Sequence, residues 1–191
     1  RSPSRGLGDV YKRQVYISGI DSRGGINEVS RSDVNIIMSI NKKTHNILMI
    51  NTPRDYYVPL SISNGVRDKL THAGVYGIEC SRNTLEMLYG IQIDYYVKVN
   101  FSGFEKIIDS LGGVDVTLDY SATLSQAGNL TVHNGVNHFN GEQALAFARE
   151  RYAYSDGDRQ RGRNQMMIME AAIKNCLLYT SPSPRDGLLS R

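Results

Sequence analysis

The sequence predicts an α/β domain in which helices cover a β-sheet of mixed direction. Residues 32–55, "SDVNIIMSINKKTHNILMINTPRD", hold two β-rich runs on either side of a polar turn, which is typical of a β-hairpin. Residues 93–118 then read as a strand, a helix and a second strand in succession. A hairpin followed by a strand, helix, strand order indicates a covered sheet in which strand directions are mixed.

The first half of the chain supplies most of the expected strands. Residues 15–21, "VYISGID", alternate in polarity and predict a strand that runs into a polar loop. Pro53 should end the second strand of the hairpin, because proline cannot donate to a ladder. Residues 68–77 and 79–90 are expected to be helices, the second ended by Gly90.

The second half alternates helices and strands. Residues 101–113 predict a helix closed by Gly112 and Gly113, and residues 114–118, "VDVTL", predict a strand. The helix over residues 140–151 should begin at Asn140, a good N-cap. A last helix over about 159–174 is expected to face the core through Met166, Met167, Met169, Ala172 and Ile173. No repeat and no domain boundary is visible.

Both ends of the chain resemble translated adapter DNA. The transposase mosaic end used in sequencing libraries reads "CLLYTS" in one frame, and its reverse complement reads "DVYKRQ"; these are residues 176–181 and 9–14. We therefore expect residues 1–14 and 176–191 to be foreign and residues 15–175 to be the natural domain.

Removal of these ends changes the charge. Six of the 22 Lys and Arg residues and two of the 19 Asp and Glu residues lie in them, which leaves 16 basic and 17 acidic residues and a net charge of −1. A near-neutral domain lacks the overall positive charge that is typical of a nucleic-acid-binding protein. A local basic patch remains an alternative. Cys80 is then alone, so no internal disulfide is expected, and no apolar run approaches the ~20 residues of a membrane helix.

Positive charge is concentrated between residues 147 and 165, "FARERYAYSDGDRQRGRNQ", which hold five arginines and three acids. On a continuous helix Arg149 and Arg151 would point about 200° apart, so both can face one ligand only if the helix ends near them. The segment "YAYSDGD" predicts that ending. A solvated helix with ion pairs is the plain alternative, but arginine suits phosphate oxygens better than lysine does.

Aspartate and arginine also occur together at three expected strand ends: Asp21 with Arg23, Arg31 with Asp33, and Arg54 with Asp55. Strand ends are where sites gather in α/β folds. Each pair alone is typical of a surface ion pair worth under about 1 kcal/mol. Together with the arginine-rich segment, they indicate a phosphate site that also holds a divalent metal.

The motifs "GIDSR", "RSDVNIIMSIN", "NTPRDYYV", "DKLTHAGVYG", "NFSGFEKIIDSLGGVDV", "FNGEQALAFARER" and "GDRQRGRNQ" occur in the order and spacing of the LytR–CpsA–Psr (LCP) family, which the chain resembles over residues 15–175. The resemblance implies a single three-layer α/β/α domain with a central mixed β-sheet and an apolar tunnel for a prenyl chain. It also implies a phosphotransferase that moves a glycopolymer, such as teichoic acid or capsule, from a polyprenyl-pyrophosphate carrier to peptidoglycan.

The same resemblance assigns roles to residues of this chain. Asp21 and Asp33 would bind Mg²⁺ or Mn²⁺. The catalytic set would be Arg54, Arg149, Arg151 and Asp158, and the pyrophosphate would also contact Arg31, Lys69, Arg161 and Gln165. A membrane helix ahead of Val15 would place the domain on the extracytoplasmic face of the plasma membrane.

Two departures from the family pattern affect this assignment. The last motif reads Arg163-Asn164-Gln165 where the family often has Arg-Gln-Gln, which puts a role for Arg159 or Arg163 in doubt. The lysine motif continues Thr71-His72-Ala73 where Asn-Ala-Tyr is more usual, and His72 is read as a packed or surface side chain. The tunnel has no distinct signal, because ordinary core explains its apolar candidates: Leu85, Leu88, Phe104, Ile107, Ile108, Leu111 and Phe147.

Two other functions compete with transfer. The older family label implies a transcriptional attenuator, against which the net charge of −1 and the lack of a helix-turn-helix signal argue. A non-catalytic prenyl-pyrophosphate-binding module or a plain pyrophosphatase would use the same site. The sequence contains no nucleophile elbow, no H-E-x-x-H and no zinc spacing.

Overall fold

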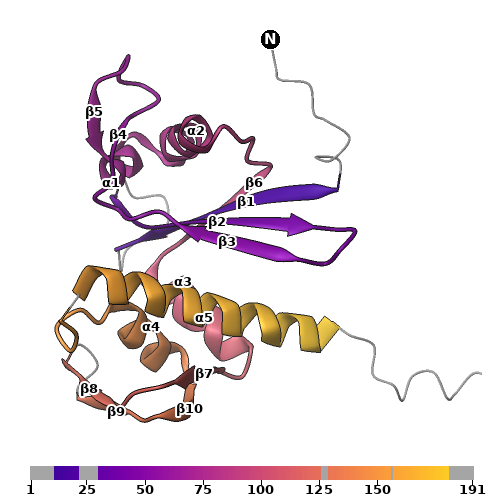
Figure 1. The fold of residues 1–191 in the computed structure, drawn as a ribbon, viewed down its shortest axis with the longest axis vertical. Helices are drawn as coiled ribbons and strands as arrows, with labels where there is room; N and C mark the ends of the chain where they lie inside the picture. Colours follow the sequence, from indigo (N-terminus) through magenta and orange to yellow (C-terminus); the bar gives the residue numbers. More distant parts are fainter. Residues whose placement is uncertain (1–10, 22–29, 126–128, 156, 181–191) are drawn as a thin grey trace, which may run out of the picture. The chain divides into compact units, whose positions relative to one another are not determined.

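A computed structural model describes residues 11–21, 30–125, 129–155 and 157–180 (Figure 1). The chain divides into two compact units, Arg1–Ser102 and Gly103–Arg191, a division that the sequence did not signal. Each unit is described by itself.

The first unit is built on a four-stranded sheet with the order β3-β2-β1-β6. Strand β1 (Lys12–Ile20) pairs antiparallel with β2 (Ser32–Asn41) and parallel with β6 (Tyr95–Val99). Strand β3 (Ile47–Asn51) pairs antiparallel with β2, so the predicted hairpin is confirmed and ends ahead of Pro53. The mixed central sheet of an α/β fold is therefore also confirmed. Strand β1 begins inside the segment 1–14, whose foreign origin stays a prediction.

Helix α2 (Ile78–Tyr89) supplies the main apolar cover of this sheet, on the side where Figure 1 also shows α1. Leu85 on α2 packs with Tyr16 of β1 and Ile37 of β2, all at most 1% exposed. Gly90 ends the helix with φ of 63°, a left-handed conformation that glycine adopts without steric cost, as the sequence predicts.

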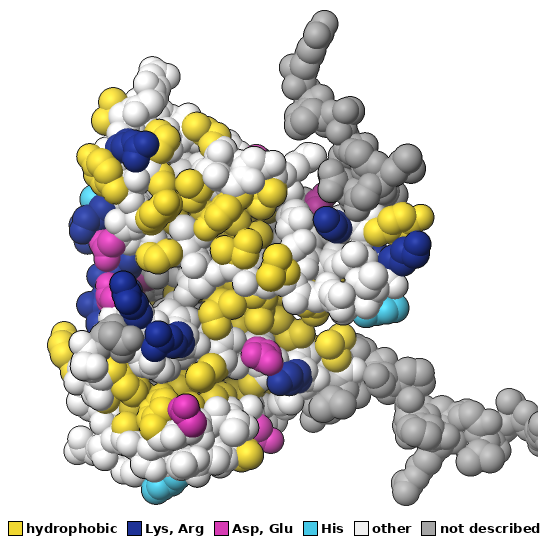
Figure 2. Space-filling model, in the orientation of Figure 1, with side chains coloured by type: hydrophobic (Ala, Val, Ile, Leu, Met, Phe, Trp, Pro, Cys, Tyr) yellow, Lys and Arg dark blue, Asp and Glu magenta, His cyan; other side chains and the backbone are white. Residues whose placement is uncertain are grey.

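The helix predicted over residues 68–77 is confirmed in part, because it begins only at Leu70 and continues as a 3₁₀ turn from Gly74. Strand β5 (Arg67–Lys69) pairs with β4 (Tyr57–Pro59), and only a short α1 (Leu70–Ala73) and a 3₁₀ turn (Gly74–Tyr76) follow. Pairing with β4 holds Arg67–Lys69 in an extended conformation, so the helical part of this segment starts after Lys69. Around these two strands the surface exposes hydrophobic side chains (Figure 2), among them Tyr57, Ile62 and Val66.

The second unit holds three helices and two small antiparallel sheets among its described residues. Helix α3 (Phe101–Ser110) begins at the division and is followed by β7 (Val114–Leu118), β8 (Ala122–Leu124), β9 (Leu130–Val132), β10 (Gly135–Phe139), α4 (Gly141–Arg149) and α5 (Gly157–Thr180). Strand β7 pairs with β10, and β8 with β9. Strand β7 therefore belongs to a two-stranded sheet with β10 and not to the four-stranded sheet.

Asn140 caps α4 as predicted, in a capping box with Gln143. Phe147 on α4 packs against Phe139 of β10, with ring centroids 5.2 Å apart, in a core that Ile108 and Ile168 also enter. The buried face of α5 runs through Gln160, Asn164, Ile168 and Ala171. The predicted core face of α5 is confirmed only in part: Met167 and Ala172 pack against the core cluster, whereas Met166 and Met169 are only partly buried.

Candidate phosphate-binding site

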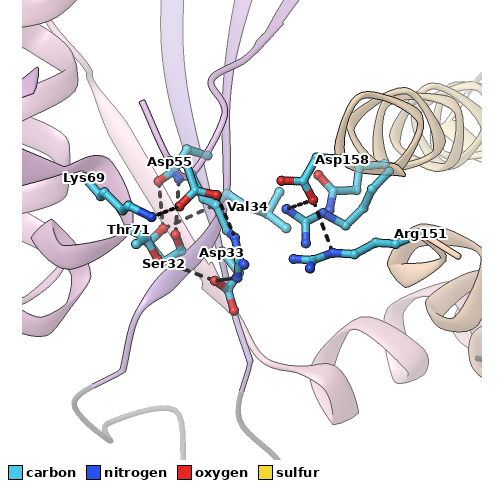
Figure 3. Close-up of polar contacts among 12 residues, drawn as sticks. Ser32, Asp33, Val34, Asp55, Lys69, Thr71, Arg151 and Asp158 are labelled. Atoms are coloured by element: carbon cyan, nitrogen blue, oxygen red, sulfur yellow. Dashed lines mark hydrogen bonds and ion pairs between the residues drawn. The ribbon is translucent and has the colours of Figure 1, made fainter. Parts of the chain in front are cut away.

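The first unit holds a chain of alternating charges built around Arg54 (Figure 3). Arg54 follows β3 and donates from Nη1 to Asp33 Oδ1 at 2.9 Å. Its Nε lies 3.5 Å from Asp55 Oδ2, and Lys69 Nζ lies 2.9 Å from Asp55 Oδ1. Asp33, Arg54 and Lys69, all predicted from the sequence, are therefore brought together in this unit.

Asp55 is the acid that holds the two cations of this cluster. The hydrogen bond from Lys69 is the largest cause that lowers the pKa of Asp55 below its usual 3.8, and the charges of Lys69 and Arg54 add to it. The carboxylate is thus ionised at neutral pH and fixes the side chains of Arg54 and Lys69. Sequence reasoning paired Asp55 with Arg54 but did not give it this bridging position.

A buried polar network fixes the start of β2, from which Asp33 projects. Tyr16 Oη donates to Asn35 Oδ1 at 2.7 Å, and Ser32 Oγ donates to the same oxygen at 2.7 Å. Ser18 Oγ lies 2.9 Å from Ser32 Oγ, and burial raises the pKa of Tyr16. Because buried hydroxyls must be paired, this network sets the position of the residues around Ser32.

Helix α1 also contacts Asp33, through Thr71. Thr71 Oγ1 lies 3.5 Å from Asp33 Oδ1, and the Thr71 N–H donates to the Arg54 carbonyl at 2.8 Å. Gly74 makes the approach possible, since a Cβ there would stand 2.5 Å from the backbone nitrogen of Ser32. The short helix therefore braces both the carboxylate and the backbone of its arginine partner.

The second unit holds a cluster of two arginines on one carboxylate (Figure 3). Asp158, in the first turn of α5, forms ion pairs through one oxygen: its Oδ1 lies 3.2 Å from Arg151 Nε and 3.3 Å from Arg161 Nη2. Asp158 is exposed, whereas the Arg161 side chain is only 13% exposed. Three predicted site residues, Arg151, Asp158 and Arg161, are thus brought together in this unit.

Helix α4 ends at Arg149, two residues short of the predicted range 140–151, so the expected end of the helix near the two arginines is confirmed. Two carbonyls in its last turn contact side chains of α5: Asn164 Nδ2 donates to the Phe147 oxygen at 2.9 Å, and Gln165 Nε2 lies 3.5 Å from the Ala148 oxygen. Gln160 Nε2 in turn donates to Asn164 Oδ1 at 2.9 Å. Gln165, predicted to reach phosphate, is therefore placed against the helix end that carries Arg149.

Asp21 and Arg31 lie on either side of residues 22–29, at the end of β1 and just before β2, and both are exposed. Arg23, named above with Asp21, lies outside the described residues. Among residues 11–21, 30–125, 129–155 and 157–180, no group of three or more His, Cys, Asp or Glu could hold a metal ion. Asp21 and Asp33 are only two carboxylates. Mg²⁺ commonly binds one or two carboxylates together with substrate phosphates, so the two remain the predicted metal ligands.

The sequence assigns no site role to Arg159, Arg163 or His72. Arg159 and Arg163 are exposed, and Arg163 Nη1 donates to Gln160 Oε1 at 3.1 Å. His72 Nδ1 lies 2.8 Å from Asp68 Oδ1, four residues earlier. The backbone N–H of Lys69, and then His72, lower the pKa of Asp68. His72 is therefore a partly exposed side chain with a local contact to Asp68, which agrees with a packed or surface histidine.

Most apolar residues considered for the tunnel belong to the two cores. Leu85 is buried in the first unit, and Ile108 and Phe147 in the second, with Phe104 and Leu88 packed against these clusters. Ile107 is 48% exposed, so a core position is wrong for it.

Glu150 and Asn164 are the structural residues that the sequence reading missed. Both are fully buried beside the predicted arginines. Asn164 carried a signal, because it stands where the family pattern usually has glutamine. Glu150 carried none beyond its place between Arg149 and Arg151.

The family model LytR_cpsA_psr matches residues 10–181. The chain is 34% identical to the Bacillus cereus polyisoprenyl-teichoic acid–peptidoglycan teichoic acid transferase TagU over 181 residues, which is 92% of this chain and 56% of that protein. The chain thus spans about half the length of this curated relative.

Solved structures agree with this match. A structure of TagT bound to LI-WTA is 31% identical, with a TM-score of 0.78 over 97% of this chain and 75% of that one. A structure of the LytR-CPS2A-psr family protein YwtF (TagT) with bound octaprenyl pyrophosphate lipid is 30% identical, with a TM-score of 0.74 over 98% and 74% of the two chains. The fold and the two arginine–carboxylate clusters define an α/β domain in which acids hold groups of basic side chains. This chain belongs to the LytR_cpsA_psr family.

Proposed function

We propose that this chain is the catalytic domain of a phosphotransferase that moves a glycopolymer from a polyprenyl-pyrophosphate carrier to peptidoglycan. The observation that carries the proposal is Arg54, held between Asp33 and Asp55 at the end of a strand. A guanidinium fixed in this way is oriented before the ligand arrives, so less side-chain entropy is lost on binding phosphate. Arg151 and Arg161, both on Asp158, repeat the arrangement.

The reaction requires positioning and neutralisation of charge more than a protein nucleophile. A sugar hydroxyl of peptidoglycan attacks the glycan-side phosphorus, the bond from that phosphorus to the bridging oxygen breaks, and polyprenyl phosphate leaves. The hydroxyl proton passes to a base, for which we propose the carboxylates of Asp21 and Asp33. Arg54, Arg149 and Arg151 stabilise the negative charge that spreads over the phosphate oxygens, while Arg31, Lys69 and Gln165 orient the diphosphate.

Magnesium fits the acids of the first unit. Asp33 gives Oδ1 to Arg54, and within the described residues its Oδ2 makes no hydrogen bond or ion pair. We propose that Asp33 and Asp21 hold Mg²⁺ or Mn²⁺ together with diphosphate oxygens. A bound divalent cation supplies Lewis-acid charge to those oxygens.

We propose teichoic acid as the glycopolymer, because the name of TagU specifies it and TagT has been solved with LI-WTA. Peptidoglycan as acceptor places the reaction on the extracytoplasmic face of the plasma membrane. No helix among the described residues is both long and apolar enough to cross a membrane. A membrane helix elsewhere in the parent protein is part of the proposal.

The test is an assay of the purified chain with a lipid-linked teichoic acid precursor, a peptidoglycan oligosaccharide and Mg²⁺. The expected product is a new glycan–peptidoglycan phosphodiester with release of polyprenyl phosphate. Hydrolysis of the diphosphate without transfer would indicate a pyrophosphatase, and tight binding without turnover would indicate a carrier module. Salt-dependent binding to promoter DNA in place of any of these would support the attenuator.

Matched arginine variants connect the product to the site. Arg54→Ala should abolish transfer, whereas Arg67→Ala, an exposed arginine on neighbouring β5, should leave it within about twofold because surface substitutions rarely change more. Circular dichroism and thermal unfolding verify that both variants are folded. Full transfer by a folded Arg54→Ala protein would overturn the proposal.

A further inference from the structure

Glu150 is a fully buried carboxylate between two site arginines. It follows the last residue of α4 and is 0% exposed. One of its oxygens, Oε1, accepts three consecutive backbone N–H groups: Arg151 at 2.8 Å, Tyr152 at 2.7 Å and Ala153 at 3.2 Å. Ser125 Oγ, near the end of β8, lies 3.4 Å from Oε2.

These contacts fix the backbone that leaves α4. Three N–H groups that converge on one oxygen define the path of residues 151–153, as a side-chain cap does for the first turn of a helix. The N–H of Glu150 itself lies 3.4 Å from the Phe147 carbonyl, which Asn164 also binds. Side chain and backbone of Glu150 thus connect the end of α4 to the loop that carries Arg151.

The start of α5 also lies close to the segment that carries Arg151. Gly157 opens α5, and a Cβ there would lie 3.2 Å from the Arg151 carbonyl oxygen, so the two segments pass close together. Asp158 follows and binds Arg151 Nε at 3.2 Å (Figure 3). The guanidinium of Arg151 is therefore held by Asp158 at its tip, while Glu150 fixes the backbone from which the side chain projects.

A buried carboxylate is costly unless it is well hydrogen-bonded, so this position would be easier to fill with an apolar residue if packing were its only purpose. We propose that Glu150 is a positioning residue for Arg151: it fixes the loop so that the arginine meets the diphosphate in one orientation. This inference rests on the function proposed above. Glu150 does not itself touch the substrate.

A double-mutant cycle separates positioning from general stability. Binding of octaprenyl pyrophosphate with Mg²⁺ is measured by calorimetry for the unaltered chain, Glu150→Ala, Arg151→Ala and the double variant. Glu150→Ala should weaken binding about tenfold, the size of one hydrogen bond to a charged group. In the Arg151→Ala background it should have no further effect, because the residue it positions is gone.

Two further variants control this cycle. Glu142→Ala removes an exposed glutamate from the first turn of the same helix and should leave binding unchanged. Glu150→Gln keeps an oxygen that can accept the three N–H groups and should restore most of the affinity. If Glu150→Ala does not fold, the Glu150→Gln and Arg151→Ala pair completes the cycle with a smaller but still non-additive effect.

Amide hydrogen exchange tests the positioning without any ligand. Exchange at residues 151–153 and the NMR signal of Arg151 Nε–H should both change in Glu150→Ala, change less in Glu150→Gln, and not change in Glu142→Ala. Failure of the unaltered chain to bind octaprenyl pyrophosphate would refute the proposed function, while these two signals would still decide whether Glu150 positions Arg151. Additive binding effects, or unchanged exchange at residues 151–153, would overturn the positioning role.

Discussion

Asp158 Oδ1 lies 3.2 Å from Arg151 Nε, and the same oxygen lies 3.3 Å from Arg161 Nη2. One exposed carboxylate thereby joins a loop arginine to a helix arginine that is three residues further along α5. Exposed ion pairs contribute under about 1 kcal/mol to stability. The value of this contact therefore lies in the orientation of the two guanidinium groups, and its predicted consequences concern ligand binding more than folding.

Arg151→Lys should reduce glycan transfer about tenfold or more, since lysine keeps the charge but loses the planar fork that can contact Asp158 and phosphate oxygens together. The free energy of unfolding should change by less than about 1 kcal/mol. Steady-state transfer assays and urea unfolding measure the two quantities. Arg159→Lys, an exposed neighbour on α5, is the matched control, and equal losses in both variants would contradict a specific role for Arg151.

Removal of divalent metal by EDTA should abolish transfer, and added Mg²⁺ should restore it. Asp33→Asn should raise the Mg²⁺ concentration needed for half-maximal rate by about tenfold, because a carboxylate binds this hard cation far better than an amide does. A magnesium titration of the rate gives the answer. Asp115→Asn, an exposed acid that pairs with His138 on the β7–β10 sheet, should leave the titration unchanged; a metal-independent rate would refute the magnesium proposal.

Asp55 should make a pH-dependent contribution to stability. Its pKa is lowered from 3.8, first by the hydrogen bond from Lys69, so the ionised form is favoured in the folded state. That contribution is present above pH 3.8 and is lost as the pH falls through the lowered value.

The difference in unfolding free energy between the unaltered chain and Asp55→Asn should therefore shrink on acidification below pH 4. Because the Asp55 side chain is 42% exposed, the difference at neutral pH should stay under about 1 kcal/mol. Urea unfolding across a pH series measures it. A difference that grows toward low pH would show that Asp55 is not held ionised by its cations.

Tyr16→Phe should destabilise the first unit by about 1–3 kcal/mol, since the buried Asn35 Oδ1 and Ser32 Oγ lose a partner that solvent cannot replace. Urea unfolding monitors the change, and the exposed Tyr57→Phe serves as control. An effect as small as that of the control would mean that the network beneath Asp33 is not needed to hold β2.

Local patterns predicted the elements whose causes lie within a few residues. The alternation in residues 15–21, the turn between residues 41 and 46, the cap at Asn140 and the left-handed stop at Gly90 all depend on neighbouring residues, and all were found. The helix predicted over residues 68–77 starts two residues late, because Asp68 and Lys69 belong to β5, a strand that exists only through pairing with β4.

The sequence by itself determined the fold class, the ending of α4 beside Arg149 and the identity of the charged residues, since composition, periodicity and motif spacing are properties of the chain. Only the tertiary structure decided which basic groups each acid contacts. Asp55 lies between Arg54 and Lys69, and Asp158 lies between Arg151 and Arg161. Glu150 instead is buried and accepts backbone N–H groups of the loop that follows it. The physical reason is that a carboxylate's partners depend on distance and burial. Those quantities are set when separate segments of the chain pack together, as residues 54–56 and 69–71 do around Asp55.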